Sequence, residues 1–599
     1  MTAFNLRAVK VHLVENLDDA AEFKHWLGTV RGGLAVDTET SGLNPWDAGA
    51  ELRLIQFGDA QQGWSIPWKD WRGLALETLD RWDGEWMTHN LAFETRWLYV
   101  HGDGYRFPTD RTHDTMIASR IIDPLQSAAL KALSDKHLDR RASFGQGALK
   151  EIMAKNNWGW GDVPINLPEY WQYGALDTVL TRGIFDKFSP LITGDGRFRS
   201  AYDLDMAVRH IASSMEIRGM RIDQDYAREQ YERLDKVHDE VITWGEEKYG
   251  INVASTIQLG GLIETLGGQI RERTARGNPK VTKDDLNFWV NTGSPELSTL
   301  AQSVIDMRES GKTAETYFKG CIEAMDVDGL VHAEINTLGA RTGRMSVSNP
   351  PLQQLPRGSA LVRNMFIPRE GNVLISTDFA QVEMRLMAHF SDDLDLIETF
   401  NEADKHGGDF FTTMGAAVYG DPEFSKKDKR RGLVKNVMYG KAYGAGVAKM
   451  AASAGVPFEQ MEVVADAINT QYPGIADMMK RVEGIGSDRE KYEGQGYVLT
   501  PFGRRLPCDN DRTYSLVNYL LQGHAAEIFK KSLIDLDSAG YGEFFVVPVH
   551  DEILVDLPAE LADEAMREIP DIMSNTTDYS VKILAESEGP LLKWGEKYE

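Results

Sequence analysis

Residues 546–558 read "VVPVHDEILVDLP". Apolar residues on both sides predict two buried β-strands, with His550, Asp551 and Glu552 where they meet. Burying an unpaired charge is costly, so two adjacent carboxylates in an apolar run need a reason. Either the charges reach water at a hairpin tip, or they converge on a cation. This stretch alone leaves both interpretations open.

The composition predicts a multidomain globular protein. Its 599 residues exceed what one core uses, which favours about two to four domains. No apolar run reaches the ~20 residues that cross a bilayer, and the N-terminus does not resemble a signal peptide. Cys321 and Cys508 are too few for a disulfide framework. We therefore expect a cytoplasmic protein with no membrane partner.

The formal net charge of −26 argues against nucleic acid as a partner, because Lys and Arg drive phosphate binding. Net charge is an average, however, and basic stretches can line a cleft inside an acidic surface. Residues 426–441, "KKDKRRGLVKNVMYGK", hold seven Lys or Arg in sixteen positions. The charge balance weakens a nucleic-acid function without excluding it.

The order of predicted elements divides the chain. Strands and helices alternate from residue 33 to about residue 185, which favours an α/β domain. A mostly helical region follows to about residue 325, and then a mixed α+β region with strands near 372–378, 496–500 and 544–556. Within 377–390, "TDFAQVEMRLMAHF", a strand end turns directly into an amphipathic helix.

Acidic residues recur in the first region. Asp37 and Glu39 in "LAVDTETSG" lie two apart in a predicted strand and therefore on one face. Such a pair suits a shared Mg²⁺ or Mn²⁺ ion, and a solvated strand end is the alternative. Glu94 follows a His-Asn pair in "THNLAFETRWL", while Tyr173 and Asp177 in "EYWQYGALDTVL" share one helix face.

Together these three stretches resemble the motifs of DnaQ-like 3′–5′ exonucleases, which have a ribonuclease H-like fold. The resemblance implies that four carboxylates hold two metal ions and that Tyr173 orients the attacking water. The implied ligands are Asp37, Glu39, Glu94 and Asp177.

Glu94 departs from this family, which normally has Asp at the position. The extra methylene moves the carboxylate by about 1.5 Å, and misplacement of about 1 Å can cost ~10²-fold in rate. Weak or absent proofreading is therefore the alternative to an active exonuclease. The family also has an aspartate at the position of Asp114, which we expect to be structural.

A second constellation includes the opening stretch. Residues 373–389, "VLISTDFAQVEMRLMAH", end an apolar strand at Asp378, and the predicted hairpin tip carries Asp551. Residues 431–444, "RGLVKNVMYGKAYG", are predicted as one helix with Arg431, Lys435 and Tyr439 on one face. These stretches resemble motifs A, C and B of family A DNA polymerases, the bacterial DNA polymerase I type.

Three further stretches resemble other segments of the family: "TGRMSVSNPPLQQLP", "GYVLTPFGRRLP" and "NYLLQGHAAEIFKK". The exonuclease motifs precede all of these, as in the family. The chain is therefore identified as a member, similar to bacteriophage enzymes without the 5′-nuclease domain. The resemblance implies a right-hand fold and template-directed addition of dNTPs to a primer 3′ end in DNA replication.

The resemblance also implies roles in the chemistry. Asp378 and Asp551 would hold two Mg²⁺ ions, for which Mn²⁺ can substitute, and would neutralise charge on the phosphates. Glu552 would assist them, with a solvated side chain as the alternative. Lys435 would protonate the leaving pyrophosphate.

Other residues are implied in binding. Arg431 and Lys435 would grip the dNTP phosphates, Tyr439 would face the sugar, and Glu383 would crowd the 2′ position. The residues implied in contacts with primer–template DNA are Arg344, Gln354, Tyr443, Gln522 and His550. For His550, a turn histidine bonded to the backbone is the alternative.

The motif order predicts an exonuclease-like domain at 1–190, a helical linker and thumb at 191–330, a palm at 331–385 and 500–599, and fingers at 386–499. The expected partners are primer–template DNA, dNTPs and other replisome proteins. We expect a monomer, in the host cytoplasm if a phage encodes it.

Two other functions compete with this prediction. A single-subunit RNA polymerase shares the palm and the Arg, Lys and Tyr helix, but Glu383 and the exonuclease motifs argue against it. A catalytically dead DNA-binding scaffold is the second. The presence of Asp378, Asp551, Arg431 and Lys435 argues against that.

Overall fold

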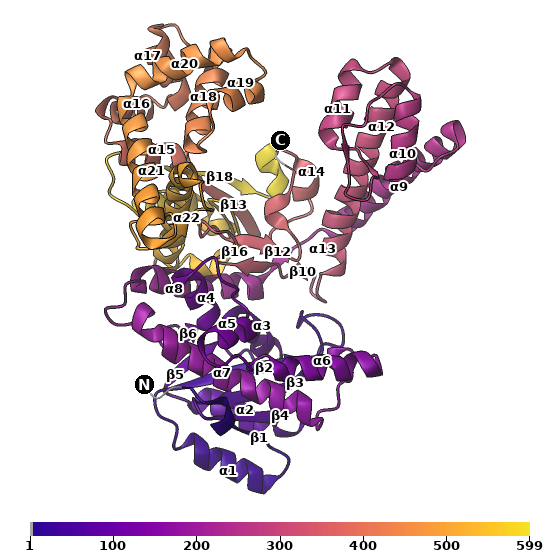
Figure 1. The fold of residues 1–599 in the computed structure, drawn as a ribbon, viewed down its shortest axis with the longest axis vertical. Helices are drawn as coiled ribbons and strands as arrows, with labels where there is room; N and C mark the ends of the chain where they lie inside the picture. Colours follow the sequence, from indigo (N-terminus) through magenta and orange to yellow (C-terminus); the bar gives the residue numbers. More distant parts are fainter. Residues whose placement is uncertain (1–3, 357) are drawn as a thin grey trace.

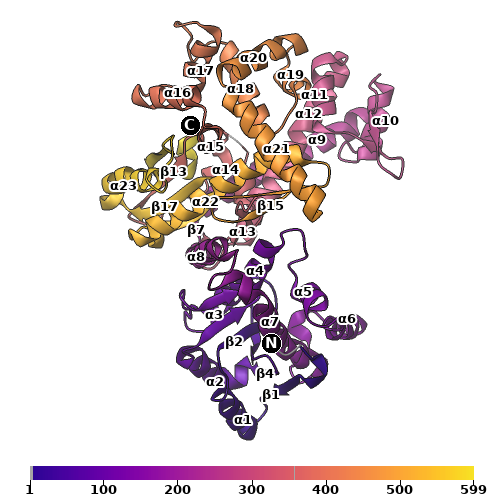
Figure 2. The ribbon, with the colours of Figure 1, turned by 60° about the vertical axis from the view of Figure 1, so that its left-hand side comes forward.

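The computed structural model describes residues 4–356 and 358–599. Figure 1 shows a first domain, in indigo and violet, below a larger assembly in which two groups of helices stand on opposite sides of a sheet. The view in Figure 2, turned by 60°, shows the same separation. This layout follows the predicted order of an α/β region, a helical region and a mixed region.

The first domain is built on a mixed sheet with the strand order β1-β4-β3-β2-β5-β6. β2 lies in the sheet interior, antiparallel to β3 and parallel to β5, and is buried at nearly every position. That burial on both faces explains its continuous apolar start. The long helix α7 packs across β2, β3 and β4. The strands are β1 Lys10–Leu13, β2 Gly33–Thr40, β3 Leu52–Gly58, β4 Gln62–Pro67, β5 Glu85–Thr88 and β6 Thr112–Asp114, and the helices are α1 Leu17–Leu27, α2 Trp68–Arg81, α3 Leu91–His101, α4 Thr115–Ile122, α5 Leu130–His137, α6 Phe144–Asn156 and α7 Pro168–Ile192.

Helix α8 (Arg199–Arg218) leads from the first domain into an arm of helices, which Figure 1 shows in magenta at the upper right. The outer part of this arm has its own apolar core, formed by Val253, Leu259, Leu286, Leu300 and Val304 with their neighbours. The arm consists of α9 Gln224–Tyr249, α10 Thr256–Thr265, β8 Glu272–Arg273, β9 Pro279–Lys280, α11 Lys283–Thr292, α12 Pro295–Lys312, a π-helical turn at Thr313–Lys319, and α13 Gly320–Glu323.

The second large sheet is antiparallel, in the order β16-β17-β13-β18. β16 (Phe545–Val549) and β17 (Glu552–Pro558) form the predicted hairpin, and the apolar strand β13 (Asn372–Phe379) pairs with β17. In this register Asp378 lies opposite Glu552, beside the hairpin tip. The other elements around this sheet are β7 Met220–Arg221, β10 Leu330–Val331, β11 Glu334–Asn336, β12 Ser346–Ser348, α14 Ala360–Arg363, α15 Val382–Ser391, β14 Tyr497–Leu499, β15 Arg505–Pro507, α22 Leu516–Ser538, α23 Ala562–Ser574 and β18 Ala585–Leu591.

Helices inserted between α15 and α22 form the orange group at the upper left of Figure 1. They are α16 Leu394–Lys405, α17 Phe410–Tyr419, α18 Arg430–Ala442, α19 Val447–Ala454, α20 Phe458–Gln471 and α21 Pro473–Glu493. The predicted helix over 431–444 ends earlier than expected. Tyr443 is its C-cap, and Gly444 has φ of +65°, a left-handed conformation that glycine adopts without strain.

A buried ionic network joins α8 to α22, which pack against each other. The β16-β17-β13-β18 sheet is called the palm sheet from here on. Asp205 accepts hydrogen bonds from Lys530 (2.6 Å) and Arg504 (2.5 Å), and Arg504 also lies 3.2 Å from Glu527. These side chains are almost completely buried. Removing one member would leave an uncompensated charge, so the network fixes how α8 sits on α22. Among the described residues, no helix is long and apolar enough to cross a membrane.

Candidate active sites

The four acidic residues predicted for the first site come from three elements of the first domain. β2 carries Asp37 and Glu39, the first turn of α3 carries Glu94, and α7 carries Asp177. Glu39, Glu94 and Asp177 are buried. The solvated strand end considered for Asp37 and Glu39 is therefore wrong, because β2 runs through the interior of the domain.

Burial shifts the proton equilibria of these acids. It raises the pKa of Asp37 to about 6 and holds the pKa values of Glu39 and Glu94 well above their usual range. The nearby charge of Asp37 raises the pKa of both glutamates further. Within the described residues, Glu94 Oε2 is buried without a hydrogen-bond partner. Clustered oxygen donors with an orphaned atom fit a hard divalent cation.

A lysine that the sequence did not single out lies in this cluster. Lys131, in the first turn of α5, is buried, and its ammonium donates to Asp177 Oδ1. The same Nζ lies 4.4 Å from the centroid of the Tyr173 ring. Burial lowers the pKa of Lys131 to about 8, although Asp37 and Glu39 oppose that shift. Only the packing of α5 against α7 distinguishes this lysine from its neighbours in the sequence.

Asp114 lies beside this site and is fully engaged by backbone groups. It accepts hydrogen bonds from the amides of Met116 and Ile117 at the start of α4, and from those of Asn90 and Leu91 before α3. This is the structural role expected of Asp114, because its oxygens fix two helix starts.

The second site lies at the end of the palm sheet. Asp378 ends β13, and Asp551 lies in the β16–β17 turn. Burial raises the pKa of Asp551 to about 6, and the charge of Asp378 adds to the rise. Partial burial also raises the pKa of Asp378. A carboxylate near the end of a strand and a second one in the adjacent turn, whose ionisation the first disfavours, form a second donor set that fits a divalent cation.

Glu552 is not solvated, so the alternative considered for it is wrong. Its side chain is buried, Ser376 Oγ donates to its Oε1 (2.6 Å), and Lys597 Nζ lies 3.2 Å from its Oε2. Lys597 also lies 3.6 Å from Asp378 Oδ1. Lys597 was not predicted. It lies in a 3₁₀ turn (Trp594–Tyr598) near the C-terminus that packs against the sheet.

Three of the residues predicted to bind the nucleotide lie along α18. One is held by an ion pair, and the others follow one another through ring contacts. Arg431 pairs with Asp409 through two bonds of 2.7 and 2.6 Å, and exposed Lys435 has its Nζ 5.7 Å from the centroid of the Tyr439 ring. Tyr439 in turn stacks on Tyr443, with ring centroids 6.2 Å apart.

Glu383 connects this helix to the carboxylates. Tyr443 donates to one of its oxygens (3.2 Å), and Arg344 donates to the other. The charges of Arg344 and Glu383 also act on the pKa of Asp551. Arg344 therefore lies at this second site and is tied there to Glu383.

The other residues predicted to contact DNA lie at the surface. His550 and Gln354 are exposed, and Gln522, on α22, is partly exposed. His550 has φ of +62°, as a residue in a tight turn does. The carbonyl of Gln354 accepts a hydrogen bond from Tyr317, which fixes its backbone beneath the arm.

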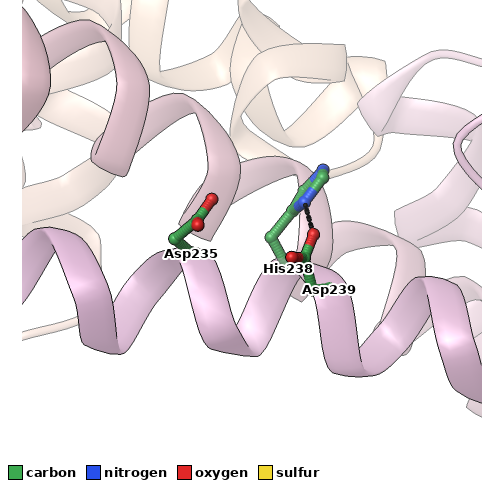
Figure 3. Close-up of side chains that lie close together, drawn as sticks. All are labelled: Asp235, His238 and Asp239. Atoms are coloured by element: carbon green, nitrogen blue, oxygen red, sulfur yellow. Dashed lines mark hydrogen bonds and ion pairs between the residues drawn. The ribbon is translucent and has the colours of Figure 1, made fainter.

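One acidic group on the arm also has metal-ligand geometry. Asp235, His238 and Asp239 on α9 have one ligand atom each within 4.8 Å of one another, and Figure 3 shows His238 hydrogen-bonded to Asp239. It is the only such trio in the described part of the chain. In neither predicted carboxylate set, therefore, do three residues have ligand atoms within 4.8 Å of one another. The three residues lie on one turn of a helix at the protein surface, where acidic groups are common.

Comparisons with known proteins give the class. A family model described as DNA polymerase family A matches residues 222–596, and one described as 3′–5′ exonuclease matches residues 11–193. The chain is 29% identical to the DNA polymerase of Mycobacterium phage D29, over 98% of this chain and 97% of that protein. It is 28% identical to DNA polymerase I of Streptococcus pneumoniae serotype 4, over 66% of this chain and 46% of that protein.

A solved structure has the same fold. The POL domain of Pol1 from M. smegmatis, in complex with DNA primer-template and dNTP, matches with a TM-score of 0.76 and 21% identity, over 98% of this chain and 99% of that one. Fold and sites thus define a nucleotide-polymerising enzyme joined to an exonuclease domain. The chain belongs to DNA polymerase family A and is a DNA-directed DNA polymerase. The predicted fold class and family are confirmed, and the RNA polymerase and scaffold alternatives are wrong.

Proposed function

We propose that this polymerase extends a primer 3′ end by two-metal phosphoryl transfer at Asp378 and Asp551, and that its exonuclease domain removes mismatched 3′ ends. The observation that carries the proposal is the meeting of Asp378 and Asp551 at the end of the palm sheet, beside Glu383 and Arg344. Asp378 lies on β13 and Asp551 in the turn between β16 and β17, so one sheet positions both acids, as two-metal chemistry requires.

Asp378 and Asp551 would hold two Mg²⁺ ions, or Mn²⁺ in their place. Such ions supply Lewis-acid stabilisation of charge on the reacting phosphate. Glu552 and Lys597 would act behind them, because Lys597 touches both Glu552 and Asp378 and so limits their movement.

The nucleotide would lie along α18. Lys435, which is exposed, would bind its phosphates and give a proton to the leaving pyrophosphate. Arg431 now makes a bidentate ion pair with Asp409. It would exchange that carboxylate for a phosphate of the nucleotide, because carboxylates and phosphates are both bidentate acceptors for a guanidinium. Tyr439 and Glu383 would meet the sugar, with Glu383 excluding a 2′-hydroxyl.

DNA would lie over the palm sheet between the arm and the finger helices, the order seen in Figure 1. The solved relative bound to primer-template and dNTP supports these ligands. The residues proposed to touch DNA are Arg344, Gln354, Tyr443, Gln522 and His550. We retain as proposals the domain limits given above, a role in replication with other replisome proteins, and a monomeric state.

In the exonuclease domain, Asp37, Glu39, Glu94 and Asp177 would hold two further divalent ions. Tyr173 would orient the attacking water from α7, one turn from Asp177. The alternative is that proofreading is weak or absent. Glu94 is longer than the usual Asp, and a misplaced carboxylate lowers the rate of excision.

Extension and degradation of a labelled primer–template test the proposal together. With Mg²⁺ and dNTPs, the primer should lengthen; without dNTPs, it should shorten from the 3′ end. A matched primer that lengthens while a mismatched one never shortens would leave the polymerase proposal intact and remove the proofreading one.

A further inference from the structure

Lys131 occupies a position that its own helix does not favour. It is the second residue of α5, where the positive end of the helix dipole repels a cation. Burial of an ammonium adds a desolvation cost. Groups outside the helix must therefore stabilise it.

Those groups are the predicted exonuclease residues. The ammonium donates to Asp177 Oδ1, a charge-assisted bond, and lies over the Tyr173 ring at 4.4 Å, within cation–π range. Asp37 and Glu39 are close enough to interact with its charge. One lysine thus partly neutralises a set of four carboxylates, three of them buried and Asp37 half-buried.

A carboxylate oxygen in contact with an ammonium is not available to a metal ion, which binds oxygen at about 2.0–2.1 Å for Mg²⁺. We propose that Lys131 is a built-in counter-cation that holds Asp177 in the metal-free exonuclease site and competes with a divalent ion for that carboxylate. This inference rests on the proposed exonuclease site. The four-carbon stem of lysine allows the ammonium to withdraw without movement of α5.

Two consequences follow for the intact chain. Lys131 lowers the affinity of the site for a divalent ion, because the ion must displace a positive charge. It also stabilises the first domain in the absence of metal, because without it Asp177 loses its ion-pair partner and the acidic set keeps only the charges of Arg53 near Glu39 and Arg96 near Glu94.

The test is Mn²⁺ binding, followed by the electron paramagnetic resonance signal of free Mn²⁺. The parent is the full chain with Asp378→Ala and Asp551→Ala, so that the polymerase site does not contribute. Lys131→Met in this background should bind Mn²⁺ about 10- to 100-fold more tightly. Lys131→Arg keeps the charge and should retain the parent affinity. Lys136→Met is the matched control, since Lys136 is exposed on the same helix.

Thermal unfolding supplies a second readout. Lys131→Met should unfold at a lower temperature than the parent after chelation and should gain more from added Mn²⁺, because binding to the folded state stabilises it in proportion to affinity.

Equal or weaker Mn²⁺ binding by Lys131→Met would overturn the inference. Asp37→Ala with Glu39→Ala separates this from failure of the site itself: that variant should lose the Mn²⁺ ion. If it binds Mn²⁺ as the parent does, the proposed exonuclease site is wrong and the inference falls with it. Should Lys131→Met not fold even with Mn²⁺, Lys131→Gln takes its place in the same titration.

Discussion

The exonuclease and polymerase carboxylates have similar chemistry in different surroundings. In the first domain the side chain of Asp177 is 8% exposed, and Lys131, which touches it, is 10% exposed. In the palm, the side chain of Asp378 is 45% exposed, with Lys597 3.6 Å away. Water therefore shares in the solvation of Asp378, whereas protein groups surround Asp177.

This difference assigns different work to the two lysines. A buried acidic cluster needs a cation to remain folded, so Lys131 chiefly affects ion binding and stability. Lys597 meets one half-exposed carboxylate, Asp378, which water already solvates, and one buried carboxylate, Glu552, which it neutralises. It therefore fixes where the two acids point and also compensates the buried charge. A lysine beside a carboxylate pair thus has a role that depends on its burial.

The largest expected effect is at the polymerase site, called the open site here because Asp378 is 45% exposed. Asp378→Ala or Asp551→Ala should lower primer extension at least ~10³-fold, because each change removes a ligand for the charge-stabilising ions. Excision should stay at the wild-type rate, because Asp37 and its partners lie in the other domain. Extension and excision of labelled primers measure both. Near-normal extension by either variant would refute the two-metal assignment.

The reciprocal change tests the exonuclease site, called the closed site here because its acids are mostly buried. Asp37→Ala with Glu39→Ala should abolish removal of a mismatched 3′ end and leave extension unchanged. A time course on matched and mismatched primers measures it. Persistent excision would mean that the nuclease centre lies elsewhere in the chain.

Sugar selection tests how far the open site extends along α18. A Tyr439 hydroxyl can replace the hydrogen bond that a missing 3′-OH would make, so wild type should incorporate dideoxynucleotides readily. Tyr439→Phe should discriminate against them by roughly 10- to 150-fold, the value of an unmade hydrogen bond near charged groups. Competition between dTTP and ddTTP measures it. Equal selectivity in both forms would remove Tyr439 from the nucleotide site.

Lys597 tests the idea that the open site needs orientation more than neutralisation. Lys597→Met should lower the rate of extension about tenfold through misplacement of Asp378 and Glu552. The unfolding temperature should fall less than that of Lys131→Met, because only one buried acid, Glu552, loses its cation. Lys593→Met, in the same segment, is the matched control. If Lys597→Met lost much stability but kept full activity, Lys597 would neutralise charge rather than orient the two acids.

The smallest expected effect concerns the length of Glu94. Glu94→Asp should raise excision a few-fold if the longer side chain detunes the closed site. Single-turnover excision of a mismatched end measures it. An unchanged rate in Glu94→Ala would show that Glu94 is no ligand, because an acid that held an ion could not be removed without loss.

Several parts of both sites follow from local patterns. The hairpin tip at Asp551, the strand that ends at Asp378 and the shared helix of Tyr173 and Asp177 were all predicted, because they depend on spacing within one element. The end of α18 before Gly444 was missed, because a left-handed glycine stops a helix whose pattern continues. The partners of Glu552 were missed as well, because they are Ser376 and a segment near the C-terminus.

The sequence by itself determined the class of enzyme and predicted the acids proposed for its two sites, since motif order and periodicity are properties of the chain. The tertiary structure alone decided which cations accompany those acids. Lys131 meets Asp177 across 46 residues and Lys597 meets Asp378 across 219, separations that no local pattern encodes. It also decided the pairing of Arg431 with Asp409 and of Arg344 with Glu383. The physical reason is that burial and charge compensation depend on which surfaces pack together, and packing is set by the whole fold.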